Sequence, residues 1–391
     1  MQEMKTRERI IALVNKEVVP AIGCTEPMAV ALCTAKAATL LGKRPDSIEV
    51  LLSPNMLKNA MGVGIPGTGM IGLPIAVALA ALIGKPEYEH EVPKELTPEA
   101  LQQGKRYIED ADIDIKLKQG IVEKLYIEVV CHSGKDQAAA IIAGSHTHFV
   151  FAERNDEVVL DERQPGGADE DDTDIQLSMR MVYDFAMTAP LDEISFILKT
   201  KEYNMRAAEL SIKGNYGHCL GKTMDRPMSH GIFGNSIFSH IISKTASACD
   251  ARMGGAMIPV MANSGSGNQG ICATNPVAVY AQENENTEEE LIRALCLSHL
   301  TAIYIKQSLG RLSALCGCVV ASIGSSCGIT YLMGGDYNRV CYSVKNMIAN
   351  LAGMICDGAK PSCALKISSG VSTAMLSAML SIEGKHVTAA E

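Results

Sequence analysis

Residues 288–315 read EEELIRALCLSHLTAIYIKQSLGRLSAL, and their apolar side chains recur three and four positions apart. This spacing puts them on one face of an α-helix. From about Leu191 onward, Ala, Ser, Gly, Ile and Leu recur in the same way, while strand patterns fade. The second half of the chain is therefore predicted to be mostly helical.

The first half carries a different pattern. Helical spacing near residues 7–18 and 28–41 alternates with strand patterns such as SIEVLLS at 47–53 and KLYIEVVCHS at 124–133. We therefore predict an α/β (α+β) domain with a Gly-rich loop over residues 1–188. A mostly α-helical domain over residues 189–391 would follow, with the boundary placed by composition alone.

Composition limits the classes of partner. The chain has 391 residues, of which 47% are hydrophobic and 20% charged, and its net charge is −9 without a basic patch. This charge disfavours nucleic acid and anionic membrane surfaces as partners. The 13 cysteines and the N-terminus without a signal-peptide pattern indicate reduced thiols in the cytoplasm. The longest apolar stretch, 70–84, is shorter than the roughly 20 residues of a membrane helix.

A Gly-rich turn, GVGIPGTG at residues 62–69, contains a formal G-x-G-x-x-G pattern. The preceding strand is too distant for a dinucleotide-binding turn, and Pro66 removes an amide. No lysine follows, as a phosphate-binding P-loop would need. We therefore predict a tight turn whose free backbone amides hold a substrate anion such as a carboxylate.

Two further stretches predict chemistry. In AIGCTEPMAV (21–30), Cys24 stands where a helix could begin, so the helix dipole could stabilise its thiolate as a nucleophile or base. A small residue in a turn explains the same spacing equally well. In MANSGSGNQGICATNP (261–276), hydroxyls and amides surround glycines, which suits binding of a small zwitterion; the candidates are Asn263, Ser264, Ser266, Asn268 and Gln269.

Cysteines also gather near the C-terminus. Cys316, Cys318 and Cys327 lie in SALCGCVVASIGSSCG, and CDGAKPSC contains Cys356 and Cys363. Gly358 and Pro361 break the helix between the last two, so those thiols either share a metal or flank an ordinary helix end. The spacing matches neither zinc ribbons nor ferredoxins and is by itself a weak metal signal.

Five motifs together resemble the L-cysteine desulfidase family: GCTEP, GIPGTG, GSGNQGI, LSALCGC and NLAGMICDGAKPSCALK. This family is serine-dehydratase-alpha-like (UPF0597 type) and is related to iron–sulfur L-serine dehydratases. The likeness runs from about residue 18 to 383. It implies a [4Fe-4S] cluster on Cys316, Cys356 and Cys363, with Cys318 as an alternative to Cys316. It further implies that Cys24 is the proton acceptor, and that substrate groups lie at Gly67, Thr68, Gly69 and the polar residues of 263–269. The chain departs from some of these dehydratases in ending HVTAAE, without a cysteine to cap the cluster.

The resemblance implies β-elimination from a small amino-acid substrate, L-cysteine, to hydrogen sulfide, pyruvate and ammonia. Two alternatives stay open: an iron–sulfur L-serine dehydratase with a hydroxide leaving group, and an iron–sulfur sensor without turnover. The sequence does not determine the oligomeric state, and a homodimer stays open.

Overall fold

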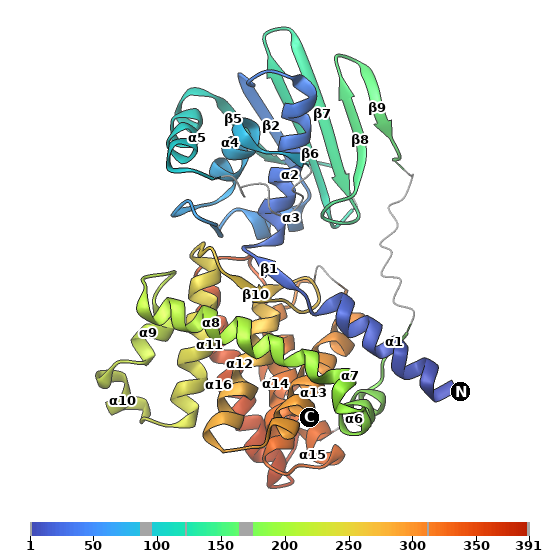
Figure 1. Cartoon of the computed structure of the whole chain (residues 1–391), viewed down its shortest axis with the longest axis vertical. Helices are drawn as coiled ribbons and strands as arrows, with labels where there is room; N and C mark the ends of the chain where they lie inside the picture. The colour runs from blue at the N-terminus through green and yellow to red at the C-terminus, as the bar shows by residue number, and fades with distance from the viewer. Residues whose placement is uncertain (1, 87–95, 122, 164–174, 311–312, 389–391) are drawn as a thin grey trace.

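The structure is a computed structural model of the chain and describes residues 2–86, 96–121, 123–163, 175–310 and 313–388. Figure 1 shows a sheet-containing half at the top and a helical half below it. The mixed α/β class and the helix-rich C-terminal region agree with the sequence prediction.

The upper half is built on a six-stranded sheet with strand order β5-β2-β6-β7-β8-β9. β2 and β5 pair in parallel, and the other neighbours pair antiparallel. Alternation along β2 buries Ile48, Val50 and Leu52 on one face. The strands are β2 Ser47–Leu52, β5 Asp112–Leu117, β6 Tyr126–Ser133, β7 Asp136–Ala143, β8 Phe149–Arg154 and β9 Glu157–Asp161.

Helices cover the buried face of this sheet. α2 (Thr25–Leu41) lies on β6 and β7, α4 (Leu73–Ile83) packs against α2, and α5 (Pro98–Asp110) packs against α4. The short α3 (Pro54–Ala60) follows β2 directly. Buried aliphatic side chains of α2 and α4 form one core with those of the sheet, which holds this half together.

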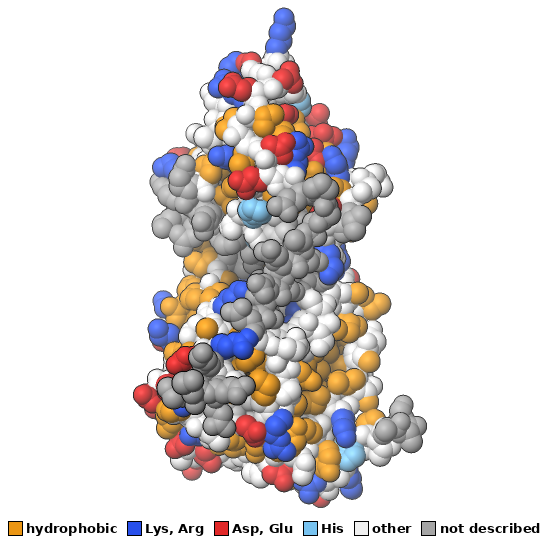
Figure 2. Space-filling model, turned by 90° about the vertical axis from the view of Figure 1, so that its right-hand side faces the viewer, with side chains coloured by type: hydrophobic (Ala, Val, Ile, Leu, Met, Phe, Trp, Pro, Cys, Tyr) orange, Lys and Arg blue, Asp and Glu red, His pale blue; other side chains and the backbone are white. Residues whose placement is uncertain are grey.

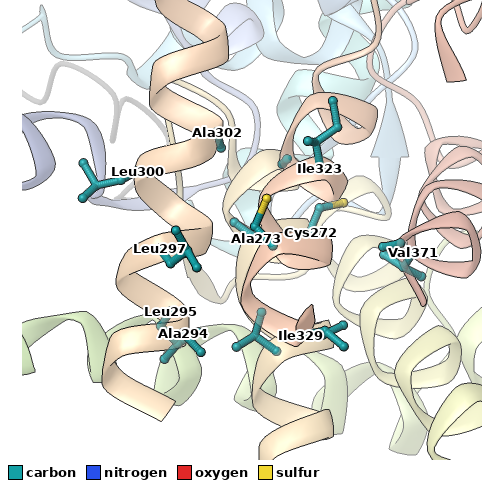
Figure 3. Packing of buried hydrophobic residues seen from close by; sticks show 14 of the residues in the cluster. Cys272, Ala273, Ala294, Leu295, Leu297, Leu300, Ala302, Ile323, Ile329 and Val371 are labelled. Atoms are coloured by element: carbon teal, nitrogen blue, oxygen red, sulfur yellow. The ribbon is translucent and has the colours of Figure 1, made fainter. Parts of the chain in front are cut away.

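The lower half is a helical assembly around α12, α13, α14 and α16. Their buried side chains belong to one hydrophobic core, and Figure 3 shows Cys272 and Ala273 of α12 between the labelled residues of α13 and Val371 of α16. Gly324 allows α14 to approach α13 closely, because a side chain there would meet the carbonyl of Ser298. The helices are α6 Met179–Thr188, α7 Leu191–Ile194, the 3-10 helix η2 Ser195–Ile197, α8 Leu198–Lys213, α9 Leu220–Met224, α10 Pro227–Phe233, α11 Ile237–Met253, α12 Gly267–Glu283, α13 Glu288–Leu309, α14 Gly317–Leu332, α15 Tyr337–Leu351 and α16 Cys363–Ile382.

The N-terminal segment lies beside the helical half in space (Figure 1). Ile10, Leu13 and Val14 of α1 (Gln2–Glu17) belong to the core of the helical half. β1 (Pro20–Ile22) then pairs antiparallel with β10 (Pro259–Met261). The division at residues 188/189 stays a prediction, although α1 packs with the later helices.

The Gly-rich turn forms a hairpin of β3 (Gly64–Ile65) and β4 (Met70–Ile71), and α4 begins after it at Leu73. A Cβ at Gly64 would lie 2.6 Å from the backbone of Gly254 and Gly255, at the end of α11. Glycine is needed here because the two halves touch backbone to backbone.

The surface of the helical half includes exposed apolar side chains. On the face shown in Figure 2, hydrophobic side chains form a broad area over this half, whereas both signs of charge mix over the sheet half. Among the described helices, α16 is long and apolar enough to cross a membrane by length and composition alone. However, 56% of its most apolar window is buried inside the protein, and α16 packs against α11, α14 and α15. A core helix of a soluble protein passes the same test.

Candidate active site

A cavity of about 120 Å³ lies where the two halves meet. The sheet half lines it with the start of α2 and with α3. The helical half contributes the end of α11, the loop before α12, α13, the start of α14 and the loop before α16. Eight of the predicted site residues line this one cavity: Cys24, Ser264, Ser266, Asn268, Gln269, Cys316, Cys356 and Cys363.

Backbone pairing brings Cys316 and Cys356 together. Leu315 and Ile355 form an isolated antiparallel bridge, the amide of Cys316 donates to the carbonyl of Met354 at 3.1 Å, and the amide of Cys356 donates to Ala314 at 2.8 Å. Two cysteines that lie 40 positions apart in sequence therefore stand on adjacent backbone segments.

The loop between Cys356 and Cys363 turns back sharply, as the glycine and proline predict. Gly358 has a φ of +102°, and a side chain there would clash with the carbonyl of Lys58 on α3. Cys363 begins α16, and its thiol donates to the carbonyl of Gly358 at 3.6 Å. Both thiols therefore reach the cavity from the two ends of one glycine-dependent turn.

An ionic cluster holds the outer side of this turn. Asp357 accepts from Lys360 at 2.5 Å and also pairs with Lys366, which donates to the carbonyl of Ile355 at 3.0 Å. The hydrogen bonds from both lysines hold the pKa of Asp357 well below its usual range. This carboxylate links the turn to the first turns of α16.

The surroundings of Cys316 and Cys363 favour the protonated form of their thiols. A hydrogen bond with Cys318 and then burial raise the pKa of Cys316, and burial chiefly raises the pKa of Cys363. Cys318 is also hydrogen-bonded to Cys272 of the core. Within the described part of the chain, no three His, Cys, Asp or Glu side chains are placed to hold a single metal ion.

The three thiols nonetheless fit an iron–sulfur cluster by their chemistry, because they are cysteines sharing one enclosed cavity. A cluster is bound through several irons, so its ligands need not converge on a single point. Metal binding would also displace the protons that burial favours here.

Cys24 is the N-cap residue of α2, so the prediction that it stands at a helix start is confirmed. The expectation of a dipole-stabilised thiolate is wrong for this arrangement: burial and the neighbouring Glu26 carboxylate raise the pKa of Cys24 well above its usual value. The thiol donates to Glu26 at 2.8 Å, and Asn59 of α3 donates to the other carboxylate oxygen at 3.1 Å. Desolvation outweighs the helix dipole here.

The loop before α12 is a tight turn closed by a bridge between Asn263 and Ser266. Ser264 has a φ of +48°, and its hydroxyl donates to the side chain of Asn263 at 2.8 Å. Asn263 does not line the cavity; its side chain lies 3.0 Å from the ring of His299, and burial lowers the pKa of His299 to about 3. Asn263 thus anchors the loop to α13, while Ser264 and Ser266 face the cavity.

Gly67, Thr68 and Gly69 do not line the cavity. The amide of Gly67 donates to Gly255 at 3.2 Å, that of Thr68 to Ile65 at 3.1 Å, and the Thr68 hydroxyl also bonds to Ile65. Two of the amides expected to be free are therefore engaged, and this geometry does not support a substrate role for the turn.

Several charged or amide side chains that line the cavity were not predicted from the sequence. Arg252 and Lys306 line it from α11 and α13, together with Lys58 and Asn59 of α3. Glu26 stood inside the quoted GCTEP motif without an assigned role. No local pattern marks the other four, because they meet only through the packing of the two halves.

Comparison with known proteins identifies the family of the chain. Residues 87–390 match the serine dehydratase alpha chain family. The chain is 65% identical over 385 residues to UPF0597 protein BF3560 of Bacteroides fragilis, covering 98% of this chain and 90% of that protein. A UPF0597 protein of Bacteroides thetaiotaomicron has the same identity and coverage, and one of Porphyromonas gingivalis is 52% identical over 395 residues, covering 100% of this chain and 91% of that protein.

The chain therefore belongs to the serine dehydratase alpha chain family, in its UPF0597 group. Membership supports a serine dehydratase-like protein of the lyase type, while the UPF0597 name specifies no activity.

Proposed function

We propose that the protein is an L-cysteine desulfidase that carries out [4Fe-4S]-dependent β-elimination of L-cysteine to hydrogen sulfide, pyruvate and ammonia. The observation that carries the proposal is the single cavity lined by Cys24 and by three thiols from two distant segments. Membership of a family associated with iron–sulfur cluster binding supports the same cofactor.

Cys316, Cys356 and Cys363 would hold the cluster. When bound, a cluster with three protein ligands supplies a Lewis-acidic iron for the leaving group. The bridge between the segments of Cys316 and Cys356 favours Cys316 as the third ligand. Cys318 also lines the cavity and stays the alternative ligand.

Cys24 would accept the Cα proton. Its own proton already points to Glu26, so Glu26 takes that proton as the thiolate forms, and Asn59 holds the carboxylate in place. The electron pair of the broken Cα–H bond then forms the Cα–Cβ double bond, and hydrosulfide leaves from Cβ. The resulting 2-aminoacrylate tautomerises to an imine, and one water hydrolyses the imine to pyruvate and ammonia.

The serine dehydratase name of the family favours a second candidate, L-serine dehydration. The same residues would act, with hydroxide as the leaving group in place of hydrosulfide. The two activities differ in the leaving atom alone, so comparing the two substrates decides between them.

The test is turnover by protein purified and reconstituted with iron and sulfide without oxygen. We expect sulfide and pyruvate in equal amounts from L-cysteine, with a higher kcat/KM than for pyruvate release from L-serine. Cys356→Ala should abolish both products, whereas Cys341→Ala on α15, away from the cavity, should keep them. Faster turnover of L-serine would favour the second candidate, and full activity of Cys356→Ala would contradict the cluster assignment.

A further inference from the structure

We infer that Arg252 and the N-terminus of α12 form a carboxylate subsite that binds the α-carboxylate of an amino acid; this inference rests on the proposed function and names where its substrate is held. Arg252 lies in the last turn of α11, is 4% exposed and lines the cavity.

Among the residues that the structure describes, no anion neutralises the guanidinium of Arg252. Its Nε is buried and has no hydrogen-bond partner, and among the described residues no carboxylate forms an ion pair with Arg252. A buried charge in this state is costly unless a ligand pairs with it. Arginine also presents a planar fork that matches a carboxylate in two parallel hydrogen bonds.

Gly267 makes room for this arrangement. It is the first residue of α12, and a side chain there would clash with Nε of Arg252. The guanidinium therefore lies against the start of a 17-residue helix, where backbone amides lack intrahelical partners and the dipole favours an anion. The N-cap residue, Ser266, makes no side-chain cap hydrogen bond that would occupy those amides.

The side chains beside this subsite could accept hydrogen bonds from the ammonium group of the same amino acid. The amide oxygens of Asn268 and Gln269 are buried without a hydrogen-bond partner, and both residues line the cavity. They offer acceptors for an ammonium group beside the place where the carboxylate would bind. The chemical class of ligand is therefore an α-amino acid, held by its two charged groups with its β-substituent left for the thiol side of the cavity.

The test uses L-alanine, which has both charged groups but no leaving group, and L-alaninamide, which lacks the carboxylate. Calorimetric titration is performed on the full-length protein with and without reconstituted iron. We expect wild-type protein to bind L-alanine more tightly than L-alaninamide in both forms. Arg252→Met should weaken L-alanine binding by about tenfold or more, the worth of a charge-assisted pair, and leave L-alaninamide binding little changed.

Two controls separate binding from folding. Arg206→Met, at an exposed arginine of α8, should bind L-alanine like wild type. Without ligand, Arg252→Met should unfold at the wild-type temperature or above it, because the change removes an unpaired buried charge. A lower unfolding temperature would show that the guanidinium serves the fold and would overturn the inference.

The inference of a carboxylate subsite would also be overturned if Arg252→Met bound L-alanine with wild-type affinity. It would be overturned as well if the wild-type protein did not bind L-alanine. The experiment gives a different outcome if the carboxylate subsite is correct but the proposed elimination reaction is not. If L-alanine binds through Arg252 but L-cysteine and L-serine release no pyruvate, the subsite stands and the elimination reaction does not.

Discussion

At the scale of single residues, burial decides the chemistry of Cys24. The thiol has the N-cap position that often lowers a cysteine pKa, yet its pKa is raised because water is excluded and Glu26 adds negative charge. The Arg252 charge acts in the opposite direction. The thiol of Cys24 therefore donates to Glu26 at rest, and in the proposed reaction it would act as a base only after its proton has passed to Glu26.

Replacing Glu26 should separate thiol reactivity from turnover. In Glu26→Gln the pKa of Cys24 should fall, because the carboxylate charge and its hydrogen bond both raise it. Each unit of lowering gives roughly tenfold more thiolate at any pH below the pKa. Alkylation of the Cys24 peptide by iodoacetamide, followed by mass spectrometry at pH 8, should therefore be faster, while turnover of L-cysteine falls.

The matched control is Glu49→Gln on β2, a partly exposed glutamate that pairs with Lys116 and should leave both measurements unchanged. Slower or equal alkylation in Glu26→Gln would show that Glu26 does not govern the Cys24 thiol.

At the scale of elements, the turn between Cys356 and Cys363 is held by its own charges. Asp357 joins Lys360 and Lys366, and its depressed pKa means that the folded state favours the carboxylate. The carboxylate therefore adds stability above its unfolded pKa, about 3.9, and that contribution is lost as the pH falls through its lower folded value.

Asp357→Asn should cost under about 1 kcal/mol of unfolding free energy at pH 7, because the side chain is half exposed and solvent screens its pairs. The difference from wild type should shrink as the pH is lowered from 7 to 3 and below. Urea midpoints at several pH values measure it, with Asp184→Asn, an exposed ion-pair residue of α6, as a control for general charge effects. A difference that is as large below pH 3 as at pH 7 would contradict the assignment.

The sequence predicted the positions of several helices and turns well. Helical spacing and helix-breaking residues act locally, so α13, the start of α2 and the turn at Gly358 could be expected from short stretches. The role of the Gly-rich turn could not, because the partner of the Gly67 amide is Gly255, from the other half of the molecule. The cavity residues Arg252 and Lys306 were missed for the same reason.

At the scale of the whole molecule, glycines allow the two halves to meet closely beside the cavity. Gly64 faces the backbone of Gly254 and Gly255, and Gly62 lies against Ala359 and Lys360 in the loop between Cys356 and Cys363. The packing around the site thus depends on glycines at which an added side chain would meet the other half of the molecule.

Gly64→Ala should force these segments apart, because its Cβ would lie 2.6 Å from backbone atoms. Overpacking of this kind costs roughly 1–3 kcal/mol, and we expect a lower unfolding temperature together with reduced iron loading. Gly231→Ala on α10, where an added Cβ meets nothing within 4 Å, is the matched control. An unfolding temperature equal to that of the control would show that the halves are not packed as described.

We propose that three cysteines from two segments hold one iron–sulfur cluster at this cavity. The most direct measurement is iron bound per chain after reconstitution without oxygen, in wild type and in Cys316→Ser, Cys356→Ser, Cys363→Ser and the control Cys341→Ser. We predict about four irons per chain in wild type and control, as expected for a [4Fe-4S] cluster, and a marked loss in each of the other three variants. Wild-type iron content in Cys356→Ser or Cys363→Ser would contradict the claim, and wild-type content in Cys316→Ser would contradict its choice as the third ligand.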